Sequence, residues 1–467
     1  MCSSLFKTVF FLFIVTEALF GFSQNNKTEF VIIKEVKIIG NKSTKAPIII
    51  REIPLGVGDT ILVSGLNKFL KRTESNIFNT SLFNFVTVAP VYFDDKNISL
   101  YITVEERWYW WPIPIFKLEE TNFNTWLEDK DFDRVSYGLF LAKENFRGRK
   151  ERAMLLFQAG YTEKIGVKYI VPFVNKKKTN GLNLMFSYSR NHEVAYATNN
   201  NVKSFYRSNN NYIKKEIEGV FGYELRPKLY INHNFNIAYK SVNVSDSVIA
   251  LNSNFLTPNK NQLKYLSLNY KVKRDKRNNK NYPTLGSYCD LSLNKQGLGV
   301  LDEDLNAFYL TTHLKKFWHL KNRFYLANSL KLKLSMDDDP YFLVEGLGAK
   351  NDLVRGYELY LVNGKHFGVL KNQIRYGLLE NKMFNIKAIQ ANKFNKIPLS
   401  IYLGAYFDMG YAHVDTKMAN NSLQNKMLYG GGFSADFVSY YDMVLRLEFS
   451  RNAINENGVF VHFIAPI

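Results

Sequence analysis

The feature that most restricts the fold of this chain is an alternation of apolar and polar residues, which recurs from about residue 107 onward. In residues 182–190 (LNLMFSYSR), apolar side chains occupy the even positions and mostly polar ones the odd positions. Successive side chains of a strand point to opposite faces, so a period of two gathers the apolar residues on one face. The pattern returns in residues 266–273, 330–336 and 445–450. We therefore expect a large antiparallel sheet with one apolar and one polar face.

The length of these stretches favours a membrane barrel over a soluble β-sandwich, whose strands would also alternate. A tilted strand needs about 9–11 residues to cross a bilayer, and the alternating stretches are of about this length. Their polar face carries Lys, Arg and Glu, which suits a water-filled lumen. The region after residue 106, at roughly 20–24 residues per strand and connection, predicts a transmembrane barrel of about 16 strands over 107–467.

Composition agrees with a barrel that displays aromatic side chains at the membrane surface. The 467 residues include 37 Phe and 29 Tyr, and such residues form girdles at both interfaces of membrane barrels. Beyond the N-terminus, no run of about 18 apolar residues occurs, so we expect no membrane-spanning helix.

The N-terminus has the parts of a secretory signal peptide. Lys7 precedes an apolar run that continues to Phe20, and the small residues Gly21 and Ser23 follow it. The alternative is a membrane anchor, but the run is shorter than a spanning helix needs. We expect a signal peptide over residues 1–23, and hence an exported protein.

The formal net charge of +19 would ordinarily suggest nucleic acid as a partner. The basic residues are spread along the chain, and an exported protein does not meet chromosomal DNA. A polar lumen and anionic lipid head groups account for them better, so we expect contact with outer-membrane lipids and none with nucleic acid. The 7 His residues form no paired metal-ligand motif, and no G-x-S-x-G occurs. We expect no metal, no cofactor and no enzymatic activity.

Residues 24–106 differ from the rest and predict a small α+β domain. The expected elements follow the order β-α-α-β-β. They are a strand over Phe30–Ile39, a helix capped by Thr44 that runs through 48–53, a helix capped by Ser64, and strands over 85–92 and 98–105.

This order resembles a POTRA domain, the periplasmic module of outer-membrane assembly proteins. The residues at the turns agree as well as the elements do. The matching pieces are residues 36–41 (VKIIGN), Thr44, residues 50–52 (IRE), 58–59 (GD), 82–83 (LF), 86–88 (VTV) and 102–105 (ITVE).

Four barrel segments resemble the BamA/TamA-like outer-membrane protein assembly superfamily, which has POTRA domains before a surface-antigen-type barrel. Together with the POTRA domain they cover nearly the whole mature chain in the expected order. The segments are Asp275, Arg277 and Asn278 with Pro283 and Gly286; Val354, Arg355, Gly356 and Tyr357; residues 406–410 (YFDMG); and residues 430–433 (GGGF) leading to 443–449.

The resemblance implies a loop near 340–368 that folds into the barrel and packs Arg355 against Asp408. The residues permit this, because Asp408 alternates with Phe407 and Met409 and so can face the lumen. Such a pair can form two charge-assisted hydrogen bonds. We name this expected contact, with Val354, Gly356, Tyr357 and Gly410 around it, the loop lock. The alternative is two unrelated solvated charges.

Aromatic residues and prolines follow the small domain, with Trp111, Pro112, Pro114 and Phe116 in an expected first barrel strand. Proline cannot donate to a ladder and belongs on an edge. If this strand borders the last one, their boundary, which we name the seam, lacks donors at both prolines. The superfamily is thought to insert client strands through such a seam. The alternative places the prolines in a connection outside the ladder.

These resemblances imply a non-catalytic factor for outer-membrane protein insertion, assembly or translocation. Its partners would be unfolded outer-membrane proteins or a secreted protein, with periplasmic or lipoprotein subunits on the POTRA domain. Two features depart from the superfamily's main assembly protein: only one POTRA domain fits, and Phe463 is the last aromatic residue before a non-aromatic end. A secretion pore of the two-partner type and a passive porin or ligand channel remain as alternatives.

Overall fold

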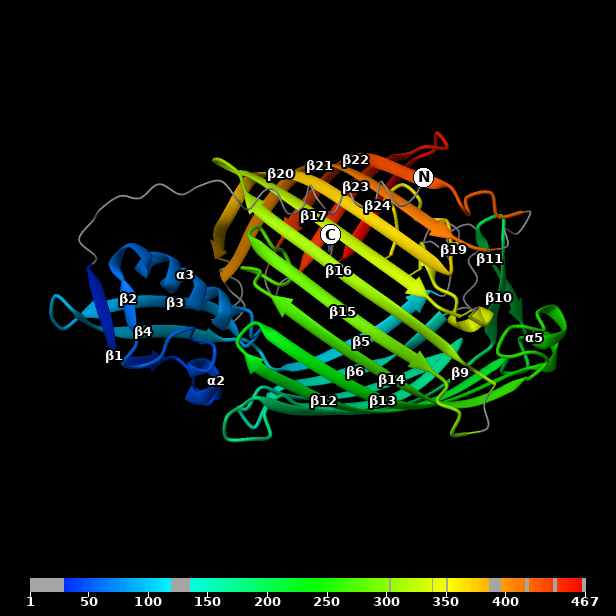
Figure 1. Ribbon diagram of the computed structural model, residues 1–467, viewed down its shortest axis with the longest axis horizontal. Helices are drawn as coiled ribbons and strands as arrows, with labels where there is room; N and C mark the ends of the chain where they lie inside the picture. The colour runs from blue at the N-terminus through cyan, green and yellow to red at the C-terminus, as the bar shows by residue number, and fades with distance from the viewer. Residues whose placement is uncertain are drawn as a thin grey trace.

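The computed structural model describes residues 29–118, 135–301, 304–337, 339–349, 352–385, 396–415, 420–439 and 443–463. A small N-terminal domain lies against one end of a large β-barrel (Figure 1). We call this end of the barrel the domain end and the opposite one the far end. The expected signal peptide lies outside the described residues.

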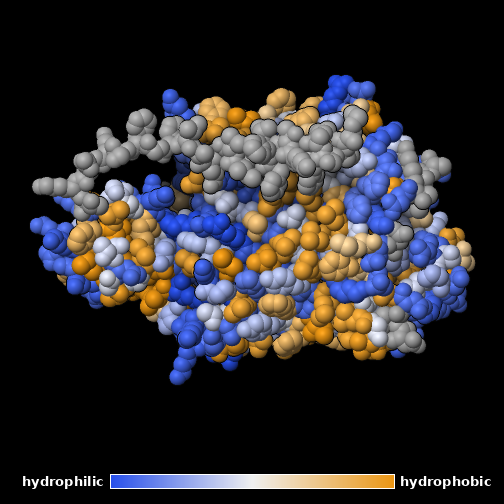
Figure 2. Space-filling model, in the orientation of Figure 1, coloured by the Kyte–Doolittle hydropathy of each residue, from blue (hydrophilic) through white to orange (hydrophobic). Residues whose placement is uncertain are grey.

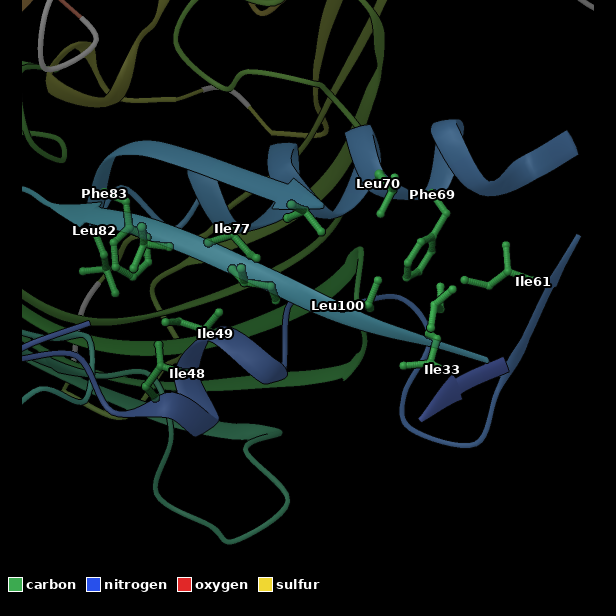
Figure 3. Close-up of a cluster of buried hydrophobic side chains, with 14 of the residues drawn as sticks. Ile33, Ile48, Ile49, Ile61, Phe69, Leu70, Ile77, Leu82, Phe83 and Leu100 are labelled. Carbon is green, nitrogen blue, oxygen red and sulfur yellow. The ribbon is translucent and has the colours of Figure 1, made fainter. Parts of the chain in front are cut away.

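The N-terminal domain packs two helices against a four-stranded sheet of order β2-β1-β4-β3. In α3 the apolar residues Leu66, Phe69, Leu70 and Ile77 recur at helical spacing and face the sheet, where they join the buried core that Figure 3 shows. The elements are β1 (Phe30–Ile39), α2 (Ala46–Ile50), β2 (Thr60–Leu62), α3 (Val63–Phe78), β3 (Phe83–Tyr92) and β4 (Asn97–Glu106).

Both expected helix caps are wrong, and one strand was not expected. Helix α2 begins after Lys45 without a side-chain cap. The hydroxyl of Thr44 instead bonds to Tyr109 Oη at 3.1 Å and accepts from Asn145 Nδ2 at 2.8 Å. Helix α3 begins directly after β2, so Ser64 lies inside its first turn and Leu62 takes the cap position. Strand β2 has three residues, too few to show a period.

The barrel is one antiparallel sheet of 16 strands, which confirms the predicted number. Each strand pairs with its neighbour in the order of the chain. The strands are β5 (Trp110–Leu118), β6 (Val135–Phe146), β7 (Glu151–Gly160), β8 (Thr162–Val171), β9 (Asn180–Asn191), β12 (Lys214–Lys228), β13 (Ile231–Val244), β14 (Gln262–Asp275), β15 (Gly286–Gln296), β16 (Ala307–His319), β17 (Phe324–Ser335), β20 (His366–Asn385), β21 (Lys396–His413), β22 (Met427–Val438), β23 (Val444–Asn452) and β24 (Asn457–Phe463).

The two faces of the sheet are inverted relative to a soluble protein. On β23, Leu447 and Phe449 are 40% and 48% exposed, whereas Arg446 and Glu448, which alternate with them, are each 2% exposed. Apolar side chains gather over the outer surface of the strands, and hydrophilic ones lie toward the ends of the barrel (Figure 2). Among the described residues, no helix is both long and apolar enough to cross a bilayer.

The far end of the barrel is covered by connections that have structure of their own. A hairpin of β10 (Glu193–Asn199) and β11 (Val202–Arg207) stands outside the barrel sheet. Asn201 at its tip donates to Asn421 Oδ1 at 2.8 Å and accepts from Leu361 N at 2.7 Å. The hairpin follows β9, whereas these partners flank β20 and β21 on the opposite wall, so it spans the mouth. Helix α5 (Asp246–Leu251) and the 3-10 helix η3 (Tyr341–Leu343) pack beside it.

At the domain end, the N-terminal domain is bonded to the turns of the barrel. Glu52, which follows α2, receives two hydrogen bonds from Arg226 at 2.6 and 2.7 Å. From α3, Arg72 donates to Tyr230 Oη and to Lys276 O, each at 2.8 Å. Asn79 donates to Arg277 O at 3.0 Å. These buried and charge-assisted contacts fix the domain against the rim.

Candidate functional site

The connection between β17 and β20 folds back into the barrel and packs against its wall. Its short strands β18 (Gly346–Leu347) and β19 (Val362–Asn363) pair with each other. Its apolar side chains, Val354 and Tyr357 among them, pack against residues of the barrel wall such as Val369 and Ala412. The loop is therefore held by a small core of its own inside the lumen.

Arg355 at the tip of the loop meets Asp408 of β21. Its Nε and Nη2 each donate to one oxygen of the carboxylate at 2.7 Å, and its backbone N–H adds a contact of 3.3 Å. Arg355 is 3% exposed and Asp408 is fully buried. A bidentate pair of this kind is among the strong charge-assisted hydrogen bonds.

Two further groups complete the surroundings of the Arg355 guanidinium. It lies over the ring of Tyr406, 3.7 Å from the ring centroid, and such stacking is favourable for a desolvated cation. Its Nη1 is 3.3 Å from Glu448 Oε1. Thus β21 and β23 both contribute to holding one loop residue.

Glycines make room for the loop. A Cβ on Gly430 of β22 would lie 1.8 Å from Arg355 O, and one on Gly410 of β21 would lie 2.4 Å from Val354 Cγ2. Gly356 has φ +94°, a conformation that residues with a Cβ rarely adopt. Its carbonyl accepts from Asn452 Nδ2 at 2.8 Å. Tyr357 is also held here, since its Oη accepts from Ala453 N at 3.3 Å.

A second buried ion pair lies beside the first, and sequence reasoning missed it. Arg446 of β23 donates to both oxygens of Asp436 of β22 at 2.6 and 2.7 Å. Asp436 also accepts from Tyr282 Oη at 2.7 Å. The only sequence signal was the inward parity of both residues, which many charged residues on these strands share.

The Tyr282 contact comes from the turn between β14 and β15, which holds the predicted barrel signature. Arg277 forms two hydrogen bonds to Asp275 at 2.9 and 2.8 Å. Asn278 Oδ1 accepts from the backbone N–H groups of Thr284 and Leu285, both at 3.1 Å. These bonds stabilise the turn from within.

The same turn contacts β20 and the N-terminal domain. Pro283 O accepts from Arg375 Nη1 of β20 at 3.1 Å. Gly286 has φ +111° and lies so close to Lys276 that a Cβ would meet its carbonyl oxygen at 2.2 Å. Since α3 also bonds to this turn, it connects the N-terminal domain with the ion pairs of the lumen.

The predicted first strand is β5, and both prolines lie within it. Trp111, Pro112, Pro114 and Phe116 stand opposite Ala142, Leu141, Leu139 and Tyr137 of β6. Among the described residues, no ladder joins β5 to β24, so these two strands are the ends of the 16-stranded sheet.

Comparison with known proteins agrees with this architecture. The model of the "Omp85 superfamily domain" matches residues 145–375. The POTRA model, described as "Surface antigen variable number repeat", matches residues 31–107. No curated protein sequence matches the chain.

Among solved structures, BamA from Haemophilus ducreyi lacking POTRA domains 1–3 is similar, with a TM-score of 0.51 at 11% identity over 93% of this chain and 84% of that one. CdiB from Escherichia coli has a TM-score of 0.49 at 8% identity, over 96% of this chain and 92% of that one. CdiB from Acinetobacter baumannii reaches 0.46 at 10% identity, covering 92% and 73%. Of these three structures only the BamA structure has a TM-score above 0.5, and it establishes a shared fold alone.

The two family matches imply a barrel in the outer membrane, a POTRA domain in the periplasm and a role in protein assembly or translocation. The domain end is then periplasmic and the far end faces outward. The chain belongs to the Omp85 superfamily, with a single POTRA domain before the barrel.

Proposed function

We propose that this protein inserts other polypeptides into the outer membrane, or moves them across it, by strand pairing at the seam and without covalent catalysis. The observation behind the proposal is the direction of the backbone hydrogen-bonding groups along β5. Glu144 N donates to Tyr109 O at 2.8 Å. Hydrogen-bonded and non-bonded positions alternate along an antiparallel pair, so odd-numbered residues of β5 bond to β6. Even-numbered residues turn their backbone groups to the free edge.

Pro112 and Pro114 are even-numbered. They leave the β5–β6 ladder intact and remove two donors from the edge that faces β24. Strand β24 has only seven residues, against nine in β5, which further limits the ladder that the two can form. A boundary with few hydrogen bonds opens at low cost, and a client strand can then pair with an exposed edge by β-augmentation.

The POTRA domain offers a second site for an extended client. In the described sheet, β2 and β3 are the outer strands, and β3 carries the exposed apolar residues Val91 and Tyr92. An unfolded outer-membrane protein or a secreted protein would present the alternating strands that such an edge binds. We propose that the loop lock keeps the lumen side of the barrel fixed while the seam opens.

The test is depletion of the protein followed by a census of outer-membrane proteins. Broad loss of barrels is expected for a general assembly factor. Loss of one exported protein would indicate a dedicated secretion pore, and an unchanged census would contradict the proposal.

A complementation experiment addresses the seam. The double substitution Pro112→Val and Pro114→Val restores two donors to the edge and should rescue depleted cells poorly. The matched control is Pro398→Val, because Pro398 lies in β21 away from the seam. Equal rescue by both variants would contradict a role for the weak edge.

A further inference from the structure

Three side chains with metal-ligand chemistry meet where the inward-folded loop approaches the last two strands. Glu358 comes from the loop, Glu448 from β23 and His462 from β24. One ligand atom from each lies within 4.8 Å of the other two. Glu448 Oε2 and His462 Nε2 are already 2.9 Å apart, because Glu448 and His462 are diagonal neighbours on the lumen face of the β23–β24 ladder.

Two of these groups have a buried side-chain atom without an assigned hydrogen bond. Glu358 Oε2 accepts from Gly356 N at 2.8 Å, which orients the carboxylate, but its Oε1 is buried without a hydrogen-bond partner. His462 Nε2 is likewise buried without an assigned hydrogen bond, although it lies 2.9 Å from Glu448 Oε2. Buried polar atoms are normally satisfied, so two such atoms in one cluster need a physical account.

The arginines around the cluster leave one oxygen of Glu448 for a further partner. Arg355 is paired with Asp408 and Arg446 with Asp436. Each arginine therefore already has an aspartate as its partner. Glu448 Oε1 lies 3.3 and 3.5 Å from these arginines, which leaves Oε2 turned toward His462.

Glu358 and Glu448 thus add two negative charges. On β20, Lys371 lies opposite Asp408 and the buried Arg375 follows on the same face, so two positive charges of the lumen offset them. Two neighbouring carboxylates in a buried site still repel each other, and a divalent ion bound between them would remove that repulsion.

We propose that Glu358, Glu448 and His462 bind one divalent transition-metal ion. Imidazole together with carboxylates suits zinc and its neighbours, whereas calcium and magnesium prefer oxygen ligands alone. Zinc bonds to such ligands at about 2.0–2.2 Å, so Glu358 must move toward the other two ligands and the Glu448–His462 pair must open slightly to admit the ion. His462 is 31% exposed on its side chain, which gives the ion a path of entry and leaves a position for water.

Such an ion would tie the loop to the strand that borders the seam. The loop lock holds the loop to β21, and the metal would add a connection to β23 and β24. Metal supply would then influence how firmly the last strand is held. The site does not depend on which polypeptide the barrel handles.

Isothermal titration of the full chain, purified in detergent and stripped with a chelator, tests the site with Zn²⁺ as the probe. We expect one equivalent to bind to the parent protein. Glu358→Gln and His462→Asn should each weaken binding by more than about tenfold, since each removes a ligand. The control is His413→Ala, which removes an exposed imidazole stacked on His366 beside Asp415 and should leave binding unchanged.

The outcomes separate the proposal from its rivals. Absence of binding to the parent would overturn it. Binding lost only in His413→Ala would assign the ion to the exposed histidine pair and would also overturn it.

Each variant is checked for its heat-dependent mobility shift on gels, which reports a folded barrel. X-ray absorption of the zinc-loaded parent requires no variant. It should show one imidazole among oxygen ligands, and two imidazoles would contradict the site.

Discussion

At the scale of single residues, Arg355 and Asp408 show how burial converts an ordinary ion pair into a strong constraint. Neither can be hydrated, so removal of one partner leaves the other as an uncompensated buried charge. We predict that Arg355→Ala lowers the free energy of unfolding by roughly 3–5 kcal/mol. Arg355→Asp should do at least as much, and the added substitution Asp408→Arg should restore part of the loss. Urea unfolding in lipid vesicles measures these changes.

The control for this prediction is an exposed ion pair of the same molecule. Lys365 Nζ lies 2.9 Å from Asp415, whose side chain is largely exposed. Such surface pairs contribute about 0–1 kcal/mol, so Lys365→Ala should leave stability almost unchanged. If Arg355→Ala changed the free energy of unfolding as little as Lys365→Ala, the loop lock would not stabilise the barrel.

Gly430 provides a steric test of the space that the loop occupies beside β22. Its missing side chain makes room for the Arg355 carbonyl, and an added Cβ would stand 1.8 Å from that oxygen. We predict that Gly430→Ala displaces the loop and exposes Arg355 to trypsin. Gly219→Ala is the matched control, because a Cβ on Gly219 of β12 would meet nothing within 4 Å. Equal cleavage of both variants would show that the loop does not need this space.

At the scale of elements, the alternation of residue types predicted the strands well because it is a local property. The strand Phe30–Ile39 has the bounds expected for it, and the number of barrel strands is as predicted. The helix caps at Thr44 and Ser64 failed, because tertiary partners and the neighbouring strand β2 decide where those helices begin.

Contacts between distant elements could not be predicted in this way. The resemblance to known barrels suggested that Arg355 would meet Asp408. No such motif marks Arg446 and Asp436, or the group of Glu358, Glu448 and His462. These residues come from different elements, and only the register of the finished sheet and the fold of the loop bring them together.

The hairpin of β10 and β11 leads to a prediction about conductance. Its tip is bonded to the opposite wall of the barrel, so we expect little current through the parent protein in a planar bilayer. Replacement of residues 193–207 by a short Gly-Ser link should raise the conductance, because it uncovers the mouth. A wide, steady pore in the parent, with conductance proportional to salt, would favour the passive channel.

At the scale of the whole molecule, the contact between POTRA domain and barrel depends on the charge of Glu52. Burial by itself would raise the pKa of Glu52, but the hydrogen bonds and charge of Arg226 outweigh it and hold the pKa below its usual value. A depressed carboxyl pKa stabilises the docked state above the usual pKa of about 4.3. This contribution to docking is lost as the pH falls through the lower pKa that Glu52 has in the docked state.

We predict that docking persists from pH 7 to about pH 5 and loosens only below the usual carboxyl range. Glu52→Gln should loosen it at every pH. Spin labels at Lys68→Cys and Lys203→Cys, with Cys289→Ser, would report the distance between domain and far end. A distribution of distances that is equally narrow in Glu52→Gln and the parent would contradict this role.

The prolines of β5 also bear on how copies of this protein behave beside one another in a crowded membrane. An unpaired strand edge invites pairing with the same edge of a second molecule, and natural sheets often interrupt such edges with proline. With donors missing at Pro112 and Pro114, two barrels that meet edge to edge cannot form a continuous ladder. The same residues that weaken the seam therefore also discourage self-association.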